Sequence, residues 1–159
     1  MHDFAIRRAD KSDLLAIYEV QLESFGADLL EPIEKFENMF NIYSDAYFVA
    51  EIESEVLGYA IAYPADDAQK DYDTRSCAPS SNHVCLYIHD LCVAPSGQGK
   101  GLARSLFSKV ESFAIDSNFQ KLIGVAVQAS IPFWSKLGFE MLYPHSYCGE
   151  DGQFMQKEL

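Results

Sequence analysis

The sequence lacks the features of a membrane or exported protein. No stretch approaches about 18 uninterrupted apolar residues, and Met-His-Asp at the amino terminus is not a basic segment followed by an apolar one. The four cysteines form no C-x-x-C pair and have no spacing typical of zinc ligands. We therefore expect a soluble, cytoplasmic protein with reduced thiols and no metal.

Basic residues are also scarce. The chain has 12 Lys and Arg against 24 Asp and Glu, a net charge of −12. This balance argues against nucleic-acid or membrane partners and favours attraction of cations, although an acidic surface that only maintains solubility is the alternative. A chain of 159 residues with 48% hydrophobic content fits a single domain over residues 1–159.

The hydrophobic periodicity predicts the order strand, two helices, three strands, helix, strand, helix, two strands. This order indicates a mixed α/β (α+β) fold whose sheet is mostly antiparallel. Asp10 or Ser12 is expected to cap the first helix, and Pro64 is expected to end the third strand. Strands are predicted at 4–9, 46–52, 56–63, 84–93, 121–127, 139–143 and 153–157, and helices from about residues 12, 30, 102 and 131.

A glycine loop joins the central strand to the helix that follows it. Gly97, Gly99 and Gly101 allow the backbone to approach a ligand closely, and the first N–H groups of the helix favour an anion such as phosphate. An ordinary strand-to-helix connection is the alternative. A Walker loop is disfavoured because Gly101 follows Lys100, and a dinucleotide loop because Leu102 stands where its third glycine would be.

Two segments carry a resemblance to a known family. Gln98-Gly-Lys-Gly-Leu-Ala103, preceded by Leu91-Cys-Val-Ala-Pro95, resembles the acetyl-CoA signature of the GNAT superfamily of N-acetyltransferases. Phe133-Trp-Ser-Lys-Leu-Gly-Phe139 resembles the family's Phe-Tyr-x-Lys-x-Gly-Phe segment. The resemblance implies the GNAT fold, with flanking helices and a splayed pair of central strands, and acetyl-CoA as the cosubstrate.

The resemblance also implies where acetyl-CoA is held. In the family, loop amides hold the pyrophosphate and pantetheine lies along the backbone at the end of the central strand. The chain has no Asn near the end of its fifth strand, so Gln128 or Ser130 is expected to replace that contact. The expected cofactor-binding residues are Leu91, Cys92, Val93, Gln98, Gly99, Lys100, Gly101, Leu102, Ala103, Gln128, Ser130, Phe133 and Lys136.

His89 is the expected general base, because histidine side chains titrate near pH 6.5. Many family members have Glu at this position, whereas the arylalkylamine N-acetyltransferases, which this strand also resembles, have His. The strand period of two places Tyr87 and His89 on one face, and Asp90 and Cys92 on the other. A hydrogen-bonded core histidine is the alternative reading.

The acid that protonates the departing thiolate is less evident. Trp134 stands where the family often has Tyr, and an indole does not release its proton. Tyr143 and Tyr147 are the candidates, with packing as the alternative for both. Because a free thiol has a pKa of about 8.5, a dedicated acid is not strictly required.

The leading interpretation is an N-acetyltransferase that acts on a small, cationic amine by direct attack in a ternary complex. Two alternatives stay open: an acyl-CoA-sensing module without turnover, and a protein or peptide acetyltransferase. Residues 65–82 are expected either to border the acceptor pocket, with Asp66, Asp67, Asp71 and Asp73 attracting cations, or to be disordered. A homodimer is also possible, since terminal strands can pair between chains.

Overall fold

The computed structural model describes residues 3–25, 30–65, 84–147 and 149–159. Within them the strands form one seven-stranded sheet in the order β1-β2-β3-β4-β5-β7-β6, in which only β4 and β5 pair in parallel. The predicted order of elements and the mixed, mostly antiparallel sheet are confirmed. The elements are β1 (Phe4–Arg8), α1 (Leu14–Ser24), α2 (Ile33–Ile42), β2 (Tyr47–Ile52), β3 (Glu55–Ala65), β4 (Cys85–Val93), α3 (Leu102–Asp116), β5 (Lys121–Val127), α4 (Ile131–Lys136), β6 (Glu140–Pro144) and β7 (Gly152–Glu158).

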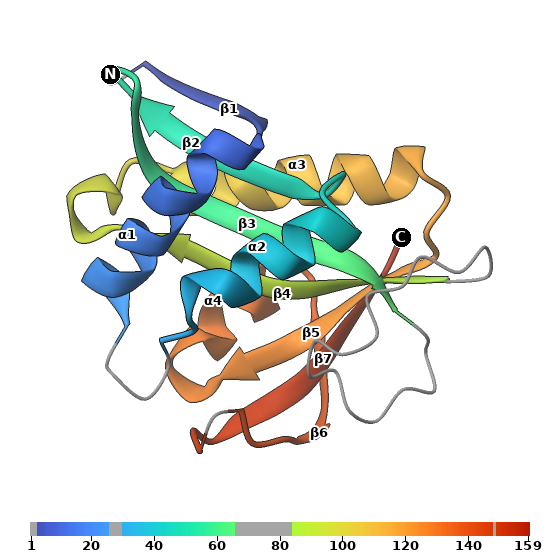
Figure 1. Ribbon diagram of the computed structural model, residues 1–159. Helices are drawn as coiled ribbons and strands as arrows, with labels where there is room; N and C mark the ends of the chain where they lie inside the picture. The colour runs from blue at the N-terminus through green and yellow to red at the C-terminus, as the bar shows by residue number, and fades with distance from the viewer. Residues whose placement is uncertain (1–2, 26–29, 66–83, 148) are drawn as a thin grey trace.

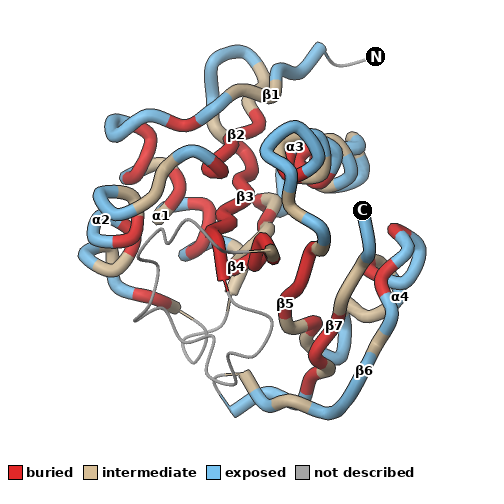
Figure 2. Tube along the Cα trace, turned by 90° about the vertical axis from the view of Figure 1, so that its right-hand side faces the viewer, coloured by how far each residue is buried: buried red, intermediate tan, exposed pale blue. Residues whose placement is uncertain are grey.

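The helices cover both faces of the sheet. α1 and α2 pack on one face, and α3 and α4 lie on the other (Figure 1). Strand residues alternate between the two layers: Tyr59 and Ile61 pack toward α1 and α2, whereas Ala60 and Ala62 pack toward α3. Figure 2 shows the resulting burial, with buried residues concentrated in the sheet between exposed outer helix faces.

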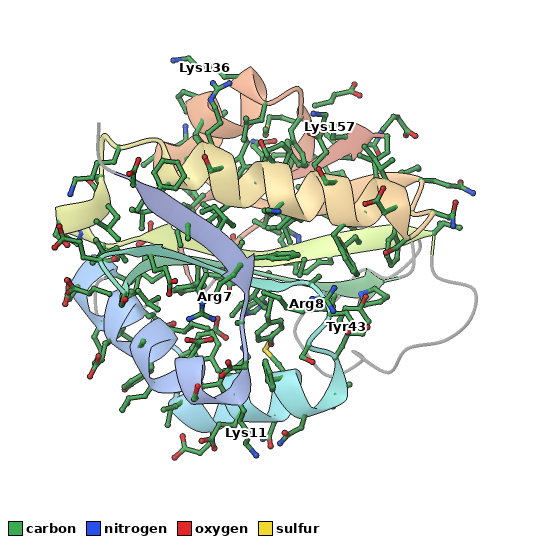
Figure 3. All side chains as sticks on the ribbon, turned by 90° about the horizontal axis from the view of Figure 1, so that it is seen from above. Arg7, Arg8, Lys11, Tyr43, Lys136 and Lys157 are labelled. Carbon is green, nitrogen blue, oxygen red and sulfur yellow. The ribbon has the colours of Figure 1, made fainter. Side chains whose placement is uncertain are left out.

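The first helical segment begins as the sequence predicts. Asp10 accepts a hydrogen bond from the Ser12 N–H, and Asp13 accepts one from the Asp10 N–H, which forms a capping box. Arg7, labelled in Figure 3, donates to both Asp13 oxygens at 2.7 and 2.8 Å. This pair ties β1 to the start of the helical layer.

The prediction that Pro64 ends the third strand is wrong, because β3 continues to Ala65 and pairs Pro64 with Leu86 of β4. The Ala62 N–H donates to the Ala46 carbonyl at 3.1 Å. Because backbone N–H groups alternate in direction along a strand, the nitrogen of Pro64 points to the same side of β3 as that of Ala62, toward β2. At that level β2 has not yet begun. A proline without an N–H therefore costs this strand no ladder hydrogen bond.

In the part of the chain that the structure describes, no helix combines the length and apolar character needed to cross a membrane.

Candidate active site

The central parallel strands diverge toward their carboxyl ends. β4 and β5 pair from Cys85–Lys121 to Ile88–Gly124, yet β4 runs on to Val93 and β5 to Val127. Beyond Ile88, β4 stays paired with β3 and β5 stays paired with β7, so each tip follows its outer neighbour. Figure 1 shows the two arrows diverging toward their tips. The sheet is therefore open where the sequence predicts the thioester arm.

A β-bulge lies at the point of divergence. Ile61 pairs with Asp90 but Ala62 pairs with Ile88, so His89 is an extra residue in β4. Tyr87 and His89 share one face as predicted, but the prediction that Asp90 and Cys92 lie on the opposite face is wrong. His89 and Asp90 both bond to groups on the α1 and α2 side, and Cys92 packs in the core cluster on that side.

A cavity of about 140 Å³ opens beside the bulge. Its polar side chains include residues from segments far apart in the chain: Glu31 from the segment before α2, His89 and Asp90 from β4, and Tyr147 from the β6–β7 connection. Trp134 of α4 forms part of its wall. This is the only site at which the predicted base and one of the predicted acids meet among the described residues.

Glu31 connects these groups. The structure buries it to 7% exposure, with Oε1 2.7 Å from His89 Nε2 and 3.4 Å from the Tyr147 hydroxyl. Lys35 contacts the other oxygen. Burial acts to raise the pKa of Glu31, but the hydrogen bonds and charges of His89 and Lys35 outweigh it and lower the pKa to about 2. Glu31 is therefore ionised at neutral pH.

A pair of hydrogen bonds explains why Glu31 turns inward. Gln21 of α1 is fully buried, donates from Nε2 to the Glu31 carbonyl at 2.8 Å, and accepts from the Glu31 N–H at 3.1 Å. Glu31 precedes α2, which begins at Ile33, so its backbone groups are free for this side-chain partner. In the sequence, the only hint of this arrangement is a glutamine among the apolar residues of the first helix, ten residues before Glu31.

Asp90 forms a second buried contact with a tyrosine. Its Oδ2 accepts a hydrogen bond from the Tyr59 hydroxyl at 2.5 Å, and Tyr59 is fully buried. Burial raises the pKa of Asp90 to about 6, against the lowering effects of His89 and Tyr59. Burial and the neighbouring Asp90 raise the pKa of Tyr59 well above its usual value.

Cys92 is the obvious sulfur nucleophile near the cavity, and its environment suppresses that role. Burial raises the pKa of the thiol to about 12, and the charge of Asp90 adds to the effect. At neutral pH the side chain is a thiol. This favours direct attack over an acetyl-cysteine intermediate.

The glycine loop on the other side of the opening presents unpaired donors. Gly99 and Gly101 have φ values of 75° and 84°, and a Cβ at either would meet no atom within 4 Å. The structure gives no acceptor in the described ranges for the backbone N–H groups of residues 99–104. These amides lie just before and within the first turn of the 15-residue helix α3, so they are available to bind an anion.

A second cavity of about 250 Å³ connects this loop to the opening. It shares Leu91, Ser130 and Trp134 with the first cavity, so the two meet at the divergent strand tips. Most of its lining consists of predicted cofactor residues. They are Leu91, Val93, Gln98, Ala103, Ser130 and Phe133.

A family model described as the acetyltransferase (GNAT) family matches residues 14–139. The chain belongs to the GNAT acetyltransferase family. A protein of Archaeoglobus fulgidus described as an uncharacterized N-acetyltransferase is 28% identical over 120 residues, which cover 71% of this chain and 75% of that protein. The family assignment makes this chain an acyltransferase, and acetyl-CoA is the acetyl donor that the family uses. The resemblance to the arylalkylamine subgroup stays a prediction.

Solved structures share the fold of this acetyltransferase. The loading GNATL domain of CurA from Lyngbya majuscula superposes with a TM-score of 0.85 at 12% identity, over 98% of both chains. The ribosomal-protein-S18-alanine N-acetyltransferase of Escherichia coli has a TM-score of 0.72 at 18% identity, covering 98% of this chain and 94% of its own. Arabidopsis thaliana Naa50, in complex with the bisubstrate analogue CoA-Ac-MVNAL, has a TM-score of 0.76 at 13% identity, covering 98% and 99%.

The remaining predicted residues of the acetyltransferase lie away from the two cavities. Tyr143 of β6 is 47% exposed, stacks on Phe154 and lines neither cavity. Lys136 projects from the outer side of α4 (Figure 3), and Gln128 lines a separate hollow below the β6–β7 connection. The predicted cation attractors Asp66, Asp67, Asp71 and Asp73 lie outside the described residues.

Proposed function

We propose that this acetyltransferase transfers the acetyl group of acetyl-CoA to a primary amine of a small, cationic acceptor. One observation carries the proposal: the opening between β4 and β5 separates an anion-binding loop from a small cavity that contains buried carboxylates and a histidine. The two substrates therefore have chemically distinct sites that meet at the strand tips.

The residues on the α3 side fit acetyl-CoA. The unpaired amides of residues 99–103 suit its diphosphate, and backbone groups of Leu91, Cys92 and Val93, free of β5, suit its pantetheine arm. Phe133 and Ser130 line the space between them. Acetyl-CoA supplies an activated acyl group whose thioester is attacked by an amine.

The residues on the α1 and α2 side fit a protonated amine. Glu31 is ionised and Asp90 lies beside it in the lining of the same cavity, so the site attracts positive charge. The cavity of about 140 Å³ suits an aliphatic amine rather than a bulky ring system. The acidic balance of the whole chain, −12, favours the same class of acceptor.

His89 takes one proton from the ammonium group, and the neutral nitrogen then attacks the thioester carbonyl. The new C–N bond forms as the C–S bond breaks. The second proton lost by the nitrogen goes to the thiolate, which leaves as free CoA thiol. Tyr147 lines the cavity and is the proposed carrier of that second proton, whereas Tyr143 is too remote for it.

A thiol-release assay with acetyl-CoA tests the acceptor class. Diamines and polyamines are expected to release CoA thiol at higher kcat/KM than arylalkylamines, amino acids or peptides, because they carry more positive charge toward Glu31 and Asp90. Several fold neighbours act on proteins or are bound to peptides, as with Naa50 and its CoA-Ac-MVNAL analogue. A preference for peptides over every diamine would replace this proposal with a peptide acetyltransferase.

Replacing the proposed base gives the second test. His89→Ala is expected to lower kcat at neutral pH by roughly 100-fold, because no other side chain among the described residues is placed to take the proton of the amine. His145→Ala removes a histidine outside both cavities and serves as the matched control. An unchanged rate in His89→Ala would eliminate His89 as the base.

A further inference from the structure

The two ring nitrogens of His89 have different surroundings. Nε2 lies 2.7 Å from Glu31 Oε1, within a pair whose side chains are 1% and 8% exposed. Nδ1 is buried and has no hydrogen-bond partner among the residues described. Because an ionised carboxylate only accepts hydrogen bonds, the proton of the neutral ring lies on Nε2. The lone pair is then on Nδ1.

We propose that Glu31 is a positioning residue that holds His89 as the Nε2–H tautomer, so that Nδ1 is the atom that takes the proton from the acceptor amine. The inference rests on the proposed function, since it assumes that His89 is the base. It adds the reacting atom and assigns a role to Glu31. Once Nδ1 has taken the proton, the Glu31 carboxylate stabilises the imidazolium that results.

The surroundings of Glu31 suit a residue that must hold a ring in one orientation. Its backbone is clamped by Gln21 on both its N–H and its carbonyl. Lys35 occupies Oε2, so Oε1 is left for His89 and the more distant Tyr147 hydroxyl. Gln21 thus holds the backbone of Glu31 and Lys35 holds its carboxylate, and the carboxylate in turn fixes the orientation of the His89 ring.

Other titratable groups surround His89 and Glu31. These groups are unchanged in the variants proposed below. Asp90 is the next residue along β4, and Tyr63 packs against the His89 ring with centroids 6.0 Å apart. The titratable and charged side chains facing His89 or Glu31 are Lys35, Tyr59, Tyr63, Tyr87, Asp90 and Tyr147.

Glu31→Gln separates positioning from packing, because the two side chains have the same shape. The Lys35 ammonium beside Oε2 requires an oxygen there, so the amide NH2 is directed toward His89. An NH2 group donates to Nε2, and the ring proton must then move to Nδ1. We expect the tautomer to reverse and kcat to fall roughly 100-fold, as for a base held in the wrong tautomer.

The tautomer is read by 15N NMR of histidine-labelled protein at alkaline pH, with the His89 signals assigned by their loss in His89→Gln. The wild-type protein is expected to show the Nε2–H form and Glu31→Gln the Nδ1–H form. Glu34→Gln removes the same charge from an exposed position of α2 and is expected to change neither the spectrum nor kcat.

Two results would overturn the inference: an Nδ1–H tautomer in the wild-type protein, or kcat within threefold of wild type in folded Glu31→Gln. The wild-type tautomer is read without Glu31→Gln, so the inference is testable even where that variant does not fold. It also requires no turnover. A failure of the tautomer assignment is therefore distinguishable from a failure of the proposed reaction, which the thiol-release assay measures.

Discussion

At the scale of single residues, the site depends on two carboxyl groups whose surroundings shift their pKa values in opposite directions. Glu31 is held ionised by His89 and Lys35 despite its burial, whereas burial raises the pKa of Asp90 to about 6. They lie on the same cavity, beside one histidine. Groups whose surroundings separate their pKa values in this way are characteristic of sites that move protons.

Asp90→Asn is expected to change how stability depends on pH. The pKa of Asp90 is raised from 3.8 to about 6 in the native state, so the native state binds this proton more tightly than the unfolded chain does. The wild-type free energy of unfolding therefore loses up to about 3 kcal/mol from this group as pH rises from about 4 to about 6. Asp90→Asn lacks that loss.

Urea unfolding of wild type and Asp90→Asn at the two ends of this window measures the difference. We expect the variant to gain stability relative to wild type at neutral pH and not near pH 4, because the asparagine carbonyl still accepts from Tyr59. An equal difference at both pH values would show that the two proteins do not differ by this ionisation.

At the scale of elements, the glycine loop and the first turn of α3 form the proposed anion site through backbone groups alone. Gly101→Ala places a side chain at a φ of 84°, which costs about 1 kcal/mol of stability, and adds a methyl group in the space proposed for the diphosphate. We expect KM for acetyl-CoA to rise at least tenfold, measured by thiol release at saturating amine.

Gly149→Ala is the matched control for that variant. Gly149 has a φ of 78° and, like Gly101, has no atom within 4 Å of an added Cβ. Gly149→Ala should lose about as much stability as Gly101→Ala without a change in KM for acetyl-CoA. Equal KM changes in the two variants would indicate that backbone strain, and not the phosphate site, causes the effect.

The elements themselves were largely predictable. Residues 121–127 form β5 as predicted, and α3 and α4 begin where the sequence places them, because their periodicity and flanking glycines are local signals. Two features were not. The continuation of β3 through Pro64 depends on where β2 begins, and the bulge at His89 depends on the register with β3. Neither feature can be predicted from the sequence of its own strand, because each depends on how a neighbouring strand pairs with it.

At the scale of the whole molecule, the site is assembled from distant parts of the chain. Glu31 and His89 are 58 residues apart, and Glu31 and Tyr147 are 116 apart. Glycine spacing indicated the cofactor loop because all of its residues are contiguous. The proposed acceptor cavity had no such signal, because its polar residues lie far apart in the sequence.

The net charge of −12 predicts how salt affects the reaction. The field of an acidic protein attracts multivalent cations, and salt screens it, so kcat/KM for a polyamine should fall about tenfold or more between about 0.01 M and about 1 M salt. A monoamine should show a shallower dependence. Both are measured at saturating acetyl-CoA, and parallel slopes for the two amines would count against electrostatic recognition.

The whole account depends on the opening between β4 and β5 as the place where acetyl-CoA and the acceptor meet. A crystal structure of the protein with CoA tests this most directly. We predict that the diphosphate accepts hydrogen bonds from amides within residues 98–103 and that the thiol lies between Val93 and Val127. CoA bound elsewhere, or β4 and β5 hydrogen-bonded to their tips in that crystal, would contradict it.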